Sequence, residues 1–499
     1  MNSIWIDTVP EILTKSQKLD SDISCDVAIV GGGLTGLTCA YYLSKKGLKV
    51  AVLEKDSLMC KTSGNTTAKI TAGHGLFYKY LIDTFGVETA KDYLACNLDA
   101  ISNIKKIIDD EKIDCDFEYQ NSYVFTKSNS YVQDIKDEVK ATHMLGLDSK
   151  LLTKIPLPIS NVLCAIEFPN QAQFNPRKYA IGLCNSILNN QGAIFENSKV
   201  TDIQKIKDMY STSVGDHVVQ SKYVILATRY PFINAPGFYF LKMYQALSYC
   251  ASFELSCNIF PGMYINAENP TLSARIAKDN DKNILLLSGC SHKVGKDSGV
   301  SDPYSTLTTF AHSIDPNSKL ISKWVTEDSV SLDKLPYIGK FSSFMPNVYI
   351  ACGFKKWGMT LSNIASNIIV DEILGNKNEY ANMFDSTRLH PIQNKKEMGN
   401  MIKEATSSIV IKKFTLPNAT IQSLALNEGK IIEFEGTKVG VYKDKDGNIY
   451  KVKPICPHLG CELSWNPVNK SWDCPCHGSR FDYTGKLLYG PALHDLTIL

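Results

Sequence analysis

The chain has 499 residues, more than one hydrophobic core organises, so two or three domains are expected; its 44% hydrophobic and 21% charged residues are typical of a globular protein. The net charge is only +2 and no basic block occurs, which argues against a nucleic-acid partner. No signal-peptide pattern opens the sequence and no apolar run is long enough to span a bilayer, so we expect a soluble, cytoplasmic protein without a transmembrane segment.

The fifteen cysteines fall into two groups. Eleven are scattered singly between Cys25 and Cys352, mostly in apolar stretches, where a free cysteine behaves as a small hydrophobic side chain. Only the last four cluster. This distribution predicts reduced cysteines in a cytoplasmic enzyme, together with one metal-binding module.

The first predicted elements form a strand–helix–strand unit. An apolar strand over residues 26–30 runs directly into residues 31–36, which read Gly-Gly-Gly-Leu-Thr-Gly, and a helical stretch follows. A second apolar strand over 50–53 ends at the acidic Glu54. This order predicts a dinucleotide-binding site: a strand, a Gly-x-Gly-x-x-Gly turn, a helix, a second strand and an acidic residue.

Each residue of this fingerprint has a physical role. Gly31 permits the tight turn, Gly33 lets a pyrophosphate approach the backbone, and Gly36 lets helix and strand pack closely. The helix N-terminus offers free N–H groups and a positive dipole to the phosphates. Glu54 is placed to accept hydrogen bonds from ribose hydroxyls, and its charge argues against a 2′-phosphate.

Later segments favour a dinucleotide larger than NAD. Residues 61–69 are rich in small hydroxyl side chains that can line its far half; the candidates are Ser63, Thr66 and Thr67. A buried strand over 222–228 ends in small residues at Ala227. Residues 347–360 again read as strand, glycine turn and helix start, where a flavin ring could rest on backbone amides.

Together these residues resemble the FAD-dependent D-amino-acid oxidase/glycine oxidase superfamily over roughly residues 24–375. Two looser family-like sequences are Asp-Lys-Leu-Pro-Tyr-Ile-Gly at 333–339 and Gly-Phe-Lys-Lys-Trp-Gly at 353–358. The resemblance implies an α/β FAD-binding Rossmann-type domain interleaved with an α+β substrate domain. The expected boundaries are an N-terminal extension over 1–23, nucleotide segments over about 24–84, 166–235 and 326–375, and substrate segments over about 85–165 and 236–325.

The resemblance also assigns cofactor contacts. Gly31, Gly33, Gly36 and Glu54 would hold the ADP half of FAD, and Val200 would flank the adenine. Residues 353–360 would cover the flavin, with Gly353, Lys356, Gly358, Met359 and Thr360 as the expected contacts. Some amine-oxidising relatives carry a carboxylate-binding lysine where Thr360 stands, which weakens a strict amino-acid assignment.

Catalytic candidates are few, because the flavin accepts the hydride and the protein supplies orientation and charge. His292 and Lys293 lie on a glycine-bounded turn after an apolar run, where a solvated loop is the alternative reading. Lys69 and Lys356 belong to the expected cofactor loops, where a lysine can stabilise the anionic reduced flavin.

The C-terminal part carries two short metal-binding motifs. Cys-x-His occupies residues 456–458 and Cys-x-x-His occupies 474–477, a pattern that can place two thiolates on one iron and two imidazoles on another. Two further cysteines, Cys461 and Cys476, lie where a disulfide could join the loops. Tetrahedral zinc would also accept two cysteines and two histidines, but zinc does not account for the extra cysteine pair.

Residues 415–499 resemble the Rieske family, which implies a small all-β domain after a linker over 376–414. The resemblance assigns Cys456 and Cys474 to one iron, His458 and His477 to the other, and a disulfide to Cys461 and Cys476. It also implies that Ser479 donates to a cluster sulfide and that residues 490–492 shield the cluster. Phe481 stands where high-potential members often have tyrosine, so a lower potential is expected.

Three functions fit these cofactors, FAD and a 2Fe–2S cluster. The first is a dehydrogenase that oxidises a small amine or amino-acid-like substrate and passes electrons singly to a protein or quinone. The second is an electron-transfer protein or reductase without amine oxidation, which could receive electrons from a donor protein. The third is a redox sensor.

Two other enzyme classes are disfavoured. A Rieske oxygenase needs a mononuclear iron site of two histidines and a carboxylate, but the histidines outside the cluster motif are isolated. A pyridine-nucleotide reductase would need a second Gly-x-Gly-x-x-Gly after a strand, and the sequence has none.

Overall fold

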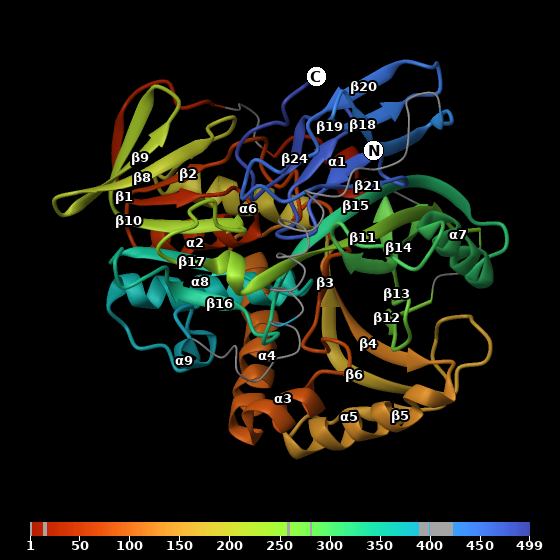
Figure 1. The fold of residues 1–499 in the computed structure, drawn as a ribbon. Coiled ribbons are helices and arrows are strands. Elements are labelled where there is room, and N and C mark those ends of the chain that lie inside the picture. The colour runs from red at the N-terminus through yellow and green to blue at the C-terminus, as the bar shows by residue number, and fades with distance from the viewer. Residues whose placement is uncertain (1, 13–16, 257–259, 280–281, 389–398, 400–422) are drawn as a thin grey trace.

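The structure, a computed structural model, describes residues 2–12, 17–256, 260–279, 282–388, 399 and 423–499. Within these residues the strands form an eight-stranded sheet, a nine-stranded sheet and two small C-terminal sheets (Figure 1). Most of the linker expected over 376–414 lies outside the described residues. Among the helices that are described, none combines the length and apolar character needed to cross a bilayer.

The eight-stranded sheet has a parallel centre in the order β17-β10-β1-β2-β7, and β16 pairs antiparallel with β17 at one edge. Its central strands are buried on both faces, which matches their continuous apolar runs. The strands are β1 (Ile23–Val30), β2 (Val50–Leu53), β7 (Ala193–Phe195), β8 (Val200–Ile206), β9 (Met209–Val214), β10 (His217–Arg229), β16 (Tyr337–Lys340) and β17 (Val348–Cys352).

Helix α2 (Leu34–Lys45) starts directly after the glycine turn and packs against α6 (Pro176–Asn189) and α8 (Gly358–Leu374). Helix α8 follows β17 in the same strand–glycine–helix order as α2 follows β1. Both helix N-termini therefore point toward the carboxyl ends of the parallel strands, the edge where ligands bind in open α/β sheets.

The nine-stranded sheet has the order β15-β11-β14-β13-β12-β4-β6-β3, with β5 beside β6. It draws on segments before and after the strands of the first sheet, so the chain crosses repeatedly between the two. Its strands are β3 (Lys69–Ile70), β4 (Glu118–Thr126), β5 (Lys150–Leu152), β6 (Cys164–Gln173), β11 (Met243–Glu254), β12 (Met263–Asn266), β13 (Leu272–Asp279), β14 (Lys282–Lys293) and β15 (Lys319–Ser331).

The remaining helices surround these sheets. The long amphipathic helix α4 packs against α3 and α8, and α7 packs against β11 and β14. They are α1 (Ile4–Thr8), α3 (Tyr78–Phe85), α4 (Val87–Asp110), α5 (Val132–Met144), α7 (Pro303–Ile314) and α9 (Ala381–Phe384), with short 3-10 turns at Asn129–Tyr131 and Tyr239–Leu241. After α9, the buried Arg388 pairs with Asp333 through Nε at 2.8 Å and NH2 at 3.0 Å, which fixes the start of the linker on the larger domain.

The C-terminal domain contains two small antiparallel sheets (blue in Figure 1). One is β18 (Glu428–Phe434), β19 (Thr437–Lys443) and β20 (Ile449–Val452); the other is β21 (Ser464–Asn466), β22 (Ser471–Asp473), β23 (Arg480–Asp482) and β24 (Leu487–Tyr489). Each metal-binding motif lies in a loop that flanks the second sheet.

An ion-pair network joins this domain to the two larger sheets. Arg480 on β23 donates from NH1 to Glu327 Oε1 at 3.0 Å, and Arg229 NH1 lies 3.3 Å from Glu327 Oε2. Arg480 also pairs with Asp473 at 3.0 Å. Arg480 and Glu327 are almost completely buried where the domains meet, so their ion pair fixes the position of the small domain on the larger one.

Candidate cofactor and active site

A long cavity follows the carboxyl edge of the eight-stranded sheet, and we name it the dinucleotide cavity. Its outer end is lined by the β1 turn and its inner end by the turn before α8; both ends share Gly33, Thr62, Ser63, Ala227 and Arg229. The predicted cofactor residues that line it are Gly31, Gly33, Glu54, Ser63, Thr66, Thr67, Val200, Ala227, Gly353, Lys356, Gly358 and Met359. Gly36 and Thr360 lie behind its wall.

Two glycines of the fingerprint are required by close backbone contacts. Gly31 has φ +111°, and a Cβ there would lie 2.7 Å from the carbonyl oxygen of Ala227. A Cβ on Gly36 would lie 2.0 Å from the Gly31 carbonyl oxygen. A side chain at Gly31 would displace the turn from β10, and one at Gly36 would displace α2 from the turn, so that the α2 N-terminus would no longer face the cavity.

Glu54 helps to shape the outer end. Its Oε2 accepts a hydrogen bond from Gly32 N at 2.7 Å, and its Oε1 accepts one from Asp56 N at 2.9 Å. Burial raises the pKa of Glu54, while these two N–H donors oppose the shift. The carboxylate therefore holds the glycine turn and keeps free lone pairs beside the cavity, where ribose hydroxyls fit.

The hydroxyl-rich loop connects distant elements around the cavity. Ser63 Oγ accepts from Leu34 N at 3.1 Å in the first turn of α2, and Thr62 Oγ1 donates to the Glu327 carbonyl at 2.8 Å. Trp5 of α1 donates from Nε1 to the Thr66 carbonyl at 2.7 Å. The loop thereby joins the first helix, the glycine turn and β15.

A second, wider cavity adjoins the inner end, and we name it the substrate cavity. Lys356 lines both cavities, and the predicted residues His292 and Lys293 line the wider one. Lys356 Nζ donates to Ser291 Oγ, so the three candidates come together around one opening. Its acidic, basic and histidine lining residues are His74, Lys79, Asp83, Asp134, Asp137, Glu138, His292, Lys293, Lys334, Lys355 and Lys356.

The turn between the cavities holds unusual backbone conformations. Lys355 and Lys356 have φ +48° and +73°, and Lys334 across the cavity has φ +65°. Non-glycine residues rarely adopt this region, and such strain concentrates at functional sites. Burial lowers the pKa of Lys355 to about 7, and the positive charges of Lys334 and Lys356 act in the same direction. The Glu138 carboxylate opposes this shift.

His292 is suited to act as a neutral group. Its ring stacks on Tyr249 with centroids 5.8 Å apart, and burial lowers its pKa. Lys356 likewise has a pKa lowered by burial, which the Asp328 carboxylate opposes. These side chains can orient a polar substrate and accept a proton from it.

The structure separates Lys69 from the other candidates. Its ammonium donates to the Tyr264 carbonyl at 2.7 Å and to Ser273 Oγ, and it lines neither cavity. Burial and the nearby Arg275 charge lower its pKa to about 7. This geometry places Lys69 in the interior of the nine-stranded sheet and outside the lining of both cavities.

The metal-binding motifs form two loops of similar backbone geometry, residues 456–461 and 474–479, which we name the cluster cradle. The amide of Cys456 donates to the Cys461 carbonyl, as that of Cys474 does to the Ser479 carbonyl, both at 2.8 Å. A glycine with positive φ follows at the fifth position of each loop. The repeated turn brings the two pairs of ligands face to face.

The four predicted ligands converge as an iron–sulfur centre requires. The imidazole rings of His458 and His477 lie 5.0 Å apart at 85°. Both Nδ1 atoms are buried and have no hydrogen-bond partner among the described residues. Cys474 lies close enough to lower the pKa of the buried Cys456 thiol by a side-chain hydrogen bond. Two orphaned nitrogens opposite two thiols fit a cluster ligated by both types.

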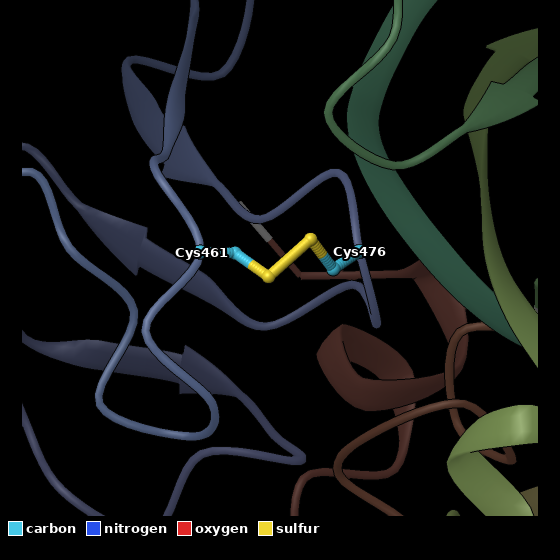
Figure 2. Close-up of a disulfide and its surroundings, with 2 residues drawn as sticks. All are labelled: Cys461 and Cys476. Atoms are coloured by element: carbon cyan, nitrogen blue, oxygen red, sulfur yellow. A yellow bond between two sulfur atoms is a disulfide. The ribbon is translucent and has the colours of Figure 1, made fainter. Parts of the chain in front are cut away.

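The predicted disulfide between Cys461 and Cys476 is present and crosses from one loop to the other (Figure 2). It occupies both cysteines that the iron ligands leave over, so the cradle cannot offer four thiolates to a zinc ion. Phe481 is fully buried in the same apolar cluster as the four cradle cysteines.

The histidine side of the cradle faces the larger domain. His458 Nε2 lies 2.9 Å from Asn234 Oδ1, and the Phe240 ring meets both imidazoles edge-on. A Cβ built on Gly478 would lie 2.3 Å from the Gln245 side chain, which shows direct packing. Gln245 Oε1 in turn accepts from Arg229 NH1 at 2.8 Å.

Sequence reasoning missed these interface residues. Asn234 lies in the segment after β10, Phe240 in the 3-10 turn Tyr239–Leu241 and Gln245 in β11, and none of them belongs to a motif. Arg229, which lines both ends of the dinucleotide cavity, had one available signal: it is one of five arginines and follows the strand that ends in Ala227. A register shift between β10 and β17 after Leu226 sets its position.

Comparison with known proteins identifies both parts. Residues 26–372 match the family described as FAD dependent oxidoreductase, and residues 416–499 match the Rieske [2Fe-2S] domain. The chain belongs to the FAD dependent oxidoreductase family. Its family domain binds FAD, its Rieske domain binds a 2Fe–2S cluster, and the protein is an oxidoreductase, as predicted.

Relatives share this organisation to different extents. YhfW of Bacillus subtilis (strain 168), which is named a Rieske 2Fe-2S iron-sulfur protein, is 34% identical over 96% of this chain and 94% of its own length. The probable oxidoreductase OrdL of Haemophilus influenzae is 24% identical over 78% of this chain and 90% of its own. The cytochrome b6-f complex iron-sulfur subunit of a Desmonostoc strain is 36% identical over 21% of this chain and 52% of its own.

Solved structures confirm the fold class. Glycine oxidase from Geobacillus kaustophilus superposes with a TM-score of 0.62 at 16% identity and covers 74% of this chain and 99% of its own. L-proline dehydrogenase from P. horikoshii gives a TM-score of 0.61 at 17% identity, with 74% and 98% covered. The larger domain is thus the predicted α/β FAD-binding fold with an interleaved α+β part, followed by a small all-β Rieske domain.

Proposed function

We propose that this oxidoreductase oxidises a small amine or amino-acid-like substrate at FAD and delivers the electrons one at a time, through its own Rieske cluster, to an external protein or quinone. When bound, FAD would supply the acceptor for a hydride from the carbon that bears nitrogen, and the cluster would supply a carrier of single electrons. The chain's own residues hold the substrate, exclude water and connect the two cofactor sites.

The observation that carries the proposal is the position of Gln245. Its side chain packs against Gly478 of the cluster cradle, and its Oε1 accepts hydrogen bonds from Arg229 at 2.8 Å and Ser329 at 2.9 Å. Arg229 and Ser329 both line the inner end of the dinucleotide cavity. One buried side chain therefore spans the space between the two cofactor sites.

The substrate cavity supports an enzyme over a simple electron carrier. It meets the dinucleotide cavity at Lys356, and a neutral His292 stands in its wall. Its lining carries both lysines and carboxylates, which suits a substrate with an ammonium and an anionic group, and YhfW and OrdL are named without a substrate. The catalytic roles of His292, Lys293 and Lys356, and the cytoplasmic location, stay predictions.

The test is anaerobic mixing of the holoprotein with a panel of amines and amino acids. Bleaching of the visible flavin band, followed by reduction of the cluster in the same molecule, is the expected result. A panel that leaves the flavin oxidised, while a ferredoxin or NADH with a reductase reduces the protein, would favour the electron-transfer alternative. A sensor would instead lose a regulatory output, but not turnover, when Cys461 is changed to Ser.

A further inference from the structure

One segment of the Rieske domain forms part of the dinucleotide cavity. Seven of the residues 487–495 line its outer end together with Gly31, Gly33 and Glu54. Gly31 and Gly33 form the phosphate-binding turn, and Glu54 follows the next strand. Residues 487–495 therefore face the place that the ADP half of the cofactor would occupy. We name residues 487–495 the C-terminal wall.

The wall contacts the larger domain through cations that line the same cavity. The Tyr489 ring lies 5.3 Å from Lys61 Nζ and 5.3 Å from Arg229 Cζ. Lys199 Nζ donates to the Leu493 carbonyl at 2.9 Å. Lys61, Lys199 and Arg229 are thereby held around the outer end, where a pyrophosphate brings negative charge.

On its other side the wall is fixed to the cluster cradle. Ala492 is buried and donates from its amide to Ser479 Oγ at 2.9 Å. Tyr489 pairs in register with Arg480, the residue that forms the buried ion pair with Glu327. The wall thus connects the cluster cradle to the dinucleotide cavity, and its position follows that of the docked Rieske domain.

We propose that the Rieske domain completes the FAD-binding site: the C-terminal wall, through Tyr489, closes the cavity over the ADP half of FAD and retains the cofactor. This role is separate from electron transfer, because it needs neither substrate nor turnover. A cavity that lost this wall would be open to water at its outer end, and FAD would leave it faster.

The experiment measures FAD release from the purified holoprotein after dilution into FAD-free buffer, by the rise of free-flavin fluorescence. Tyr489→Ala removes the ring that contacts both cations, and release should be about tenfold faster. Tyr489→Phe keeps the ring and should release FAD at the wild-type rate. The visible spectrum of the cluster reports whether the Rieske domain is still folded.

A wild-type release rate in Tyr489→Ala, with the cluster intact, overturns the inference. Should Tyr489→Ala lose its cluster, Pro491→Gly takes its place, since it loosens the wall without removing a charged contact; about threefold faster release is then expected. A wild-type rate of FAD release in Pro491→Gly also overturns the inference. Because no substrate is present, these outcomes leave the amine-oxidation test independent.

Discussion

The cluster cradle and the dinucleotide cavity are built in opposite ways. All four iron ligands and the disulfide come from residues 456–477, within one pair of loops. The dinucleotide cavity collects its lining from the glycine turn, the hydroxyl loop, β10, β15, the turn before α8 and the C-terminal wall. A local site can be recognised from its motif, whereas a dispersed site depends on how the domains pack.

The largest effect should follow from breaking the local site. Cys474→Ser replaces a thiolate ligand with an alcohol, and the protein should lose its cluster completely, measured as iron and acid-labile sulfide per chain. The matched control, Cys25→Ser on β1, should keep both. A wild-type protein that contains zinc and no iron would contradict the cluster assignment.

Separating the two regions should have the next largest effect. Glu327→Ala removes the carboxylate shared by the buried Arg480 and the half-buried Arg229, while Arg480 keeps Asp473, and should lower the free energy of unfolding by about 1.5–3 kcal/mol. Chemical denaturation followed at the cluster band measures it. Glu433→Gln, at an exposed position on β18, should change stability by less than about 0.5 kcal/mol. Equal stabilities of the two variants would mean that the network does not hold the domains together.

A smaller change should tune the cluster without moving it. Phe481→Tyr adds a hydroxyl within the apolar cluster of cradle cysteines, and a hydrogen bond to a ligand sulfur should raise the reduction potential by about 50 mV. Redox titration of the cluster measures the shift, with Phe434→Tyr on the exposed β18 as the control. A potential that does not move would show that the hydroxyl fails to reach the sulfur.

The smallest expected effect concerns pH at the substrate cavity. Lys355 has a pKa lowered to about 7, so it is charged below pH 7 and loses its proton above it. Binding of a small carboxylate such as acetate, measured by the shift of the flavin band, should therefore weaken by severalfold between pH 6 and about 8.5. Lys355→Met should bind acetate weakly at every pH in this range. If this variant keeps the pH dependence of the wild-type protein, another group causes the effect.

The sequence predicts the strand–glycine–helix unit well for a physical reason. Only glycine fits at Gly31 and Gly36, because backbone oxygens occupy the space of any Cβ. The sequence predicts the cradle equally well, because only a few residue types can bind iron, which restricts the choice of residue at Cys456, His458 and the other two ligand positions. In contrast, Lys69 shares the hydroxyl loop with Ser63 but turns into the other sheet, since β3 pairs with β6 there.

The order of residues by itself determined the two cofactors, because each motif places its ligand-binding atoms through local backbone geometry. Tertiary structure alone decided what lies between the two cofactor sites: Asn234 against a cluster histidine, Gln245 between the cradle and Arg229, and the C-terminal wall over the cavity. Asn234 and Gln245 belong to no motif, and the family loop at 490–492 does not reveal in the sequence that it faces the cavity, since these positions follow from sheet register and from a buried ion pair between segments far apart in the chain.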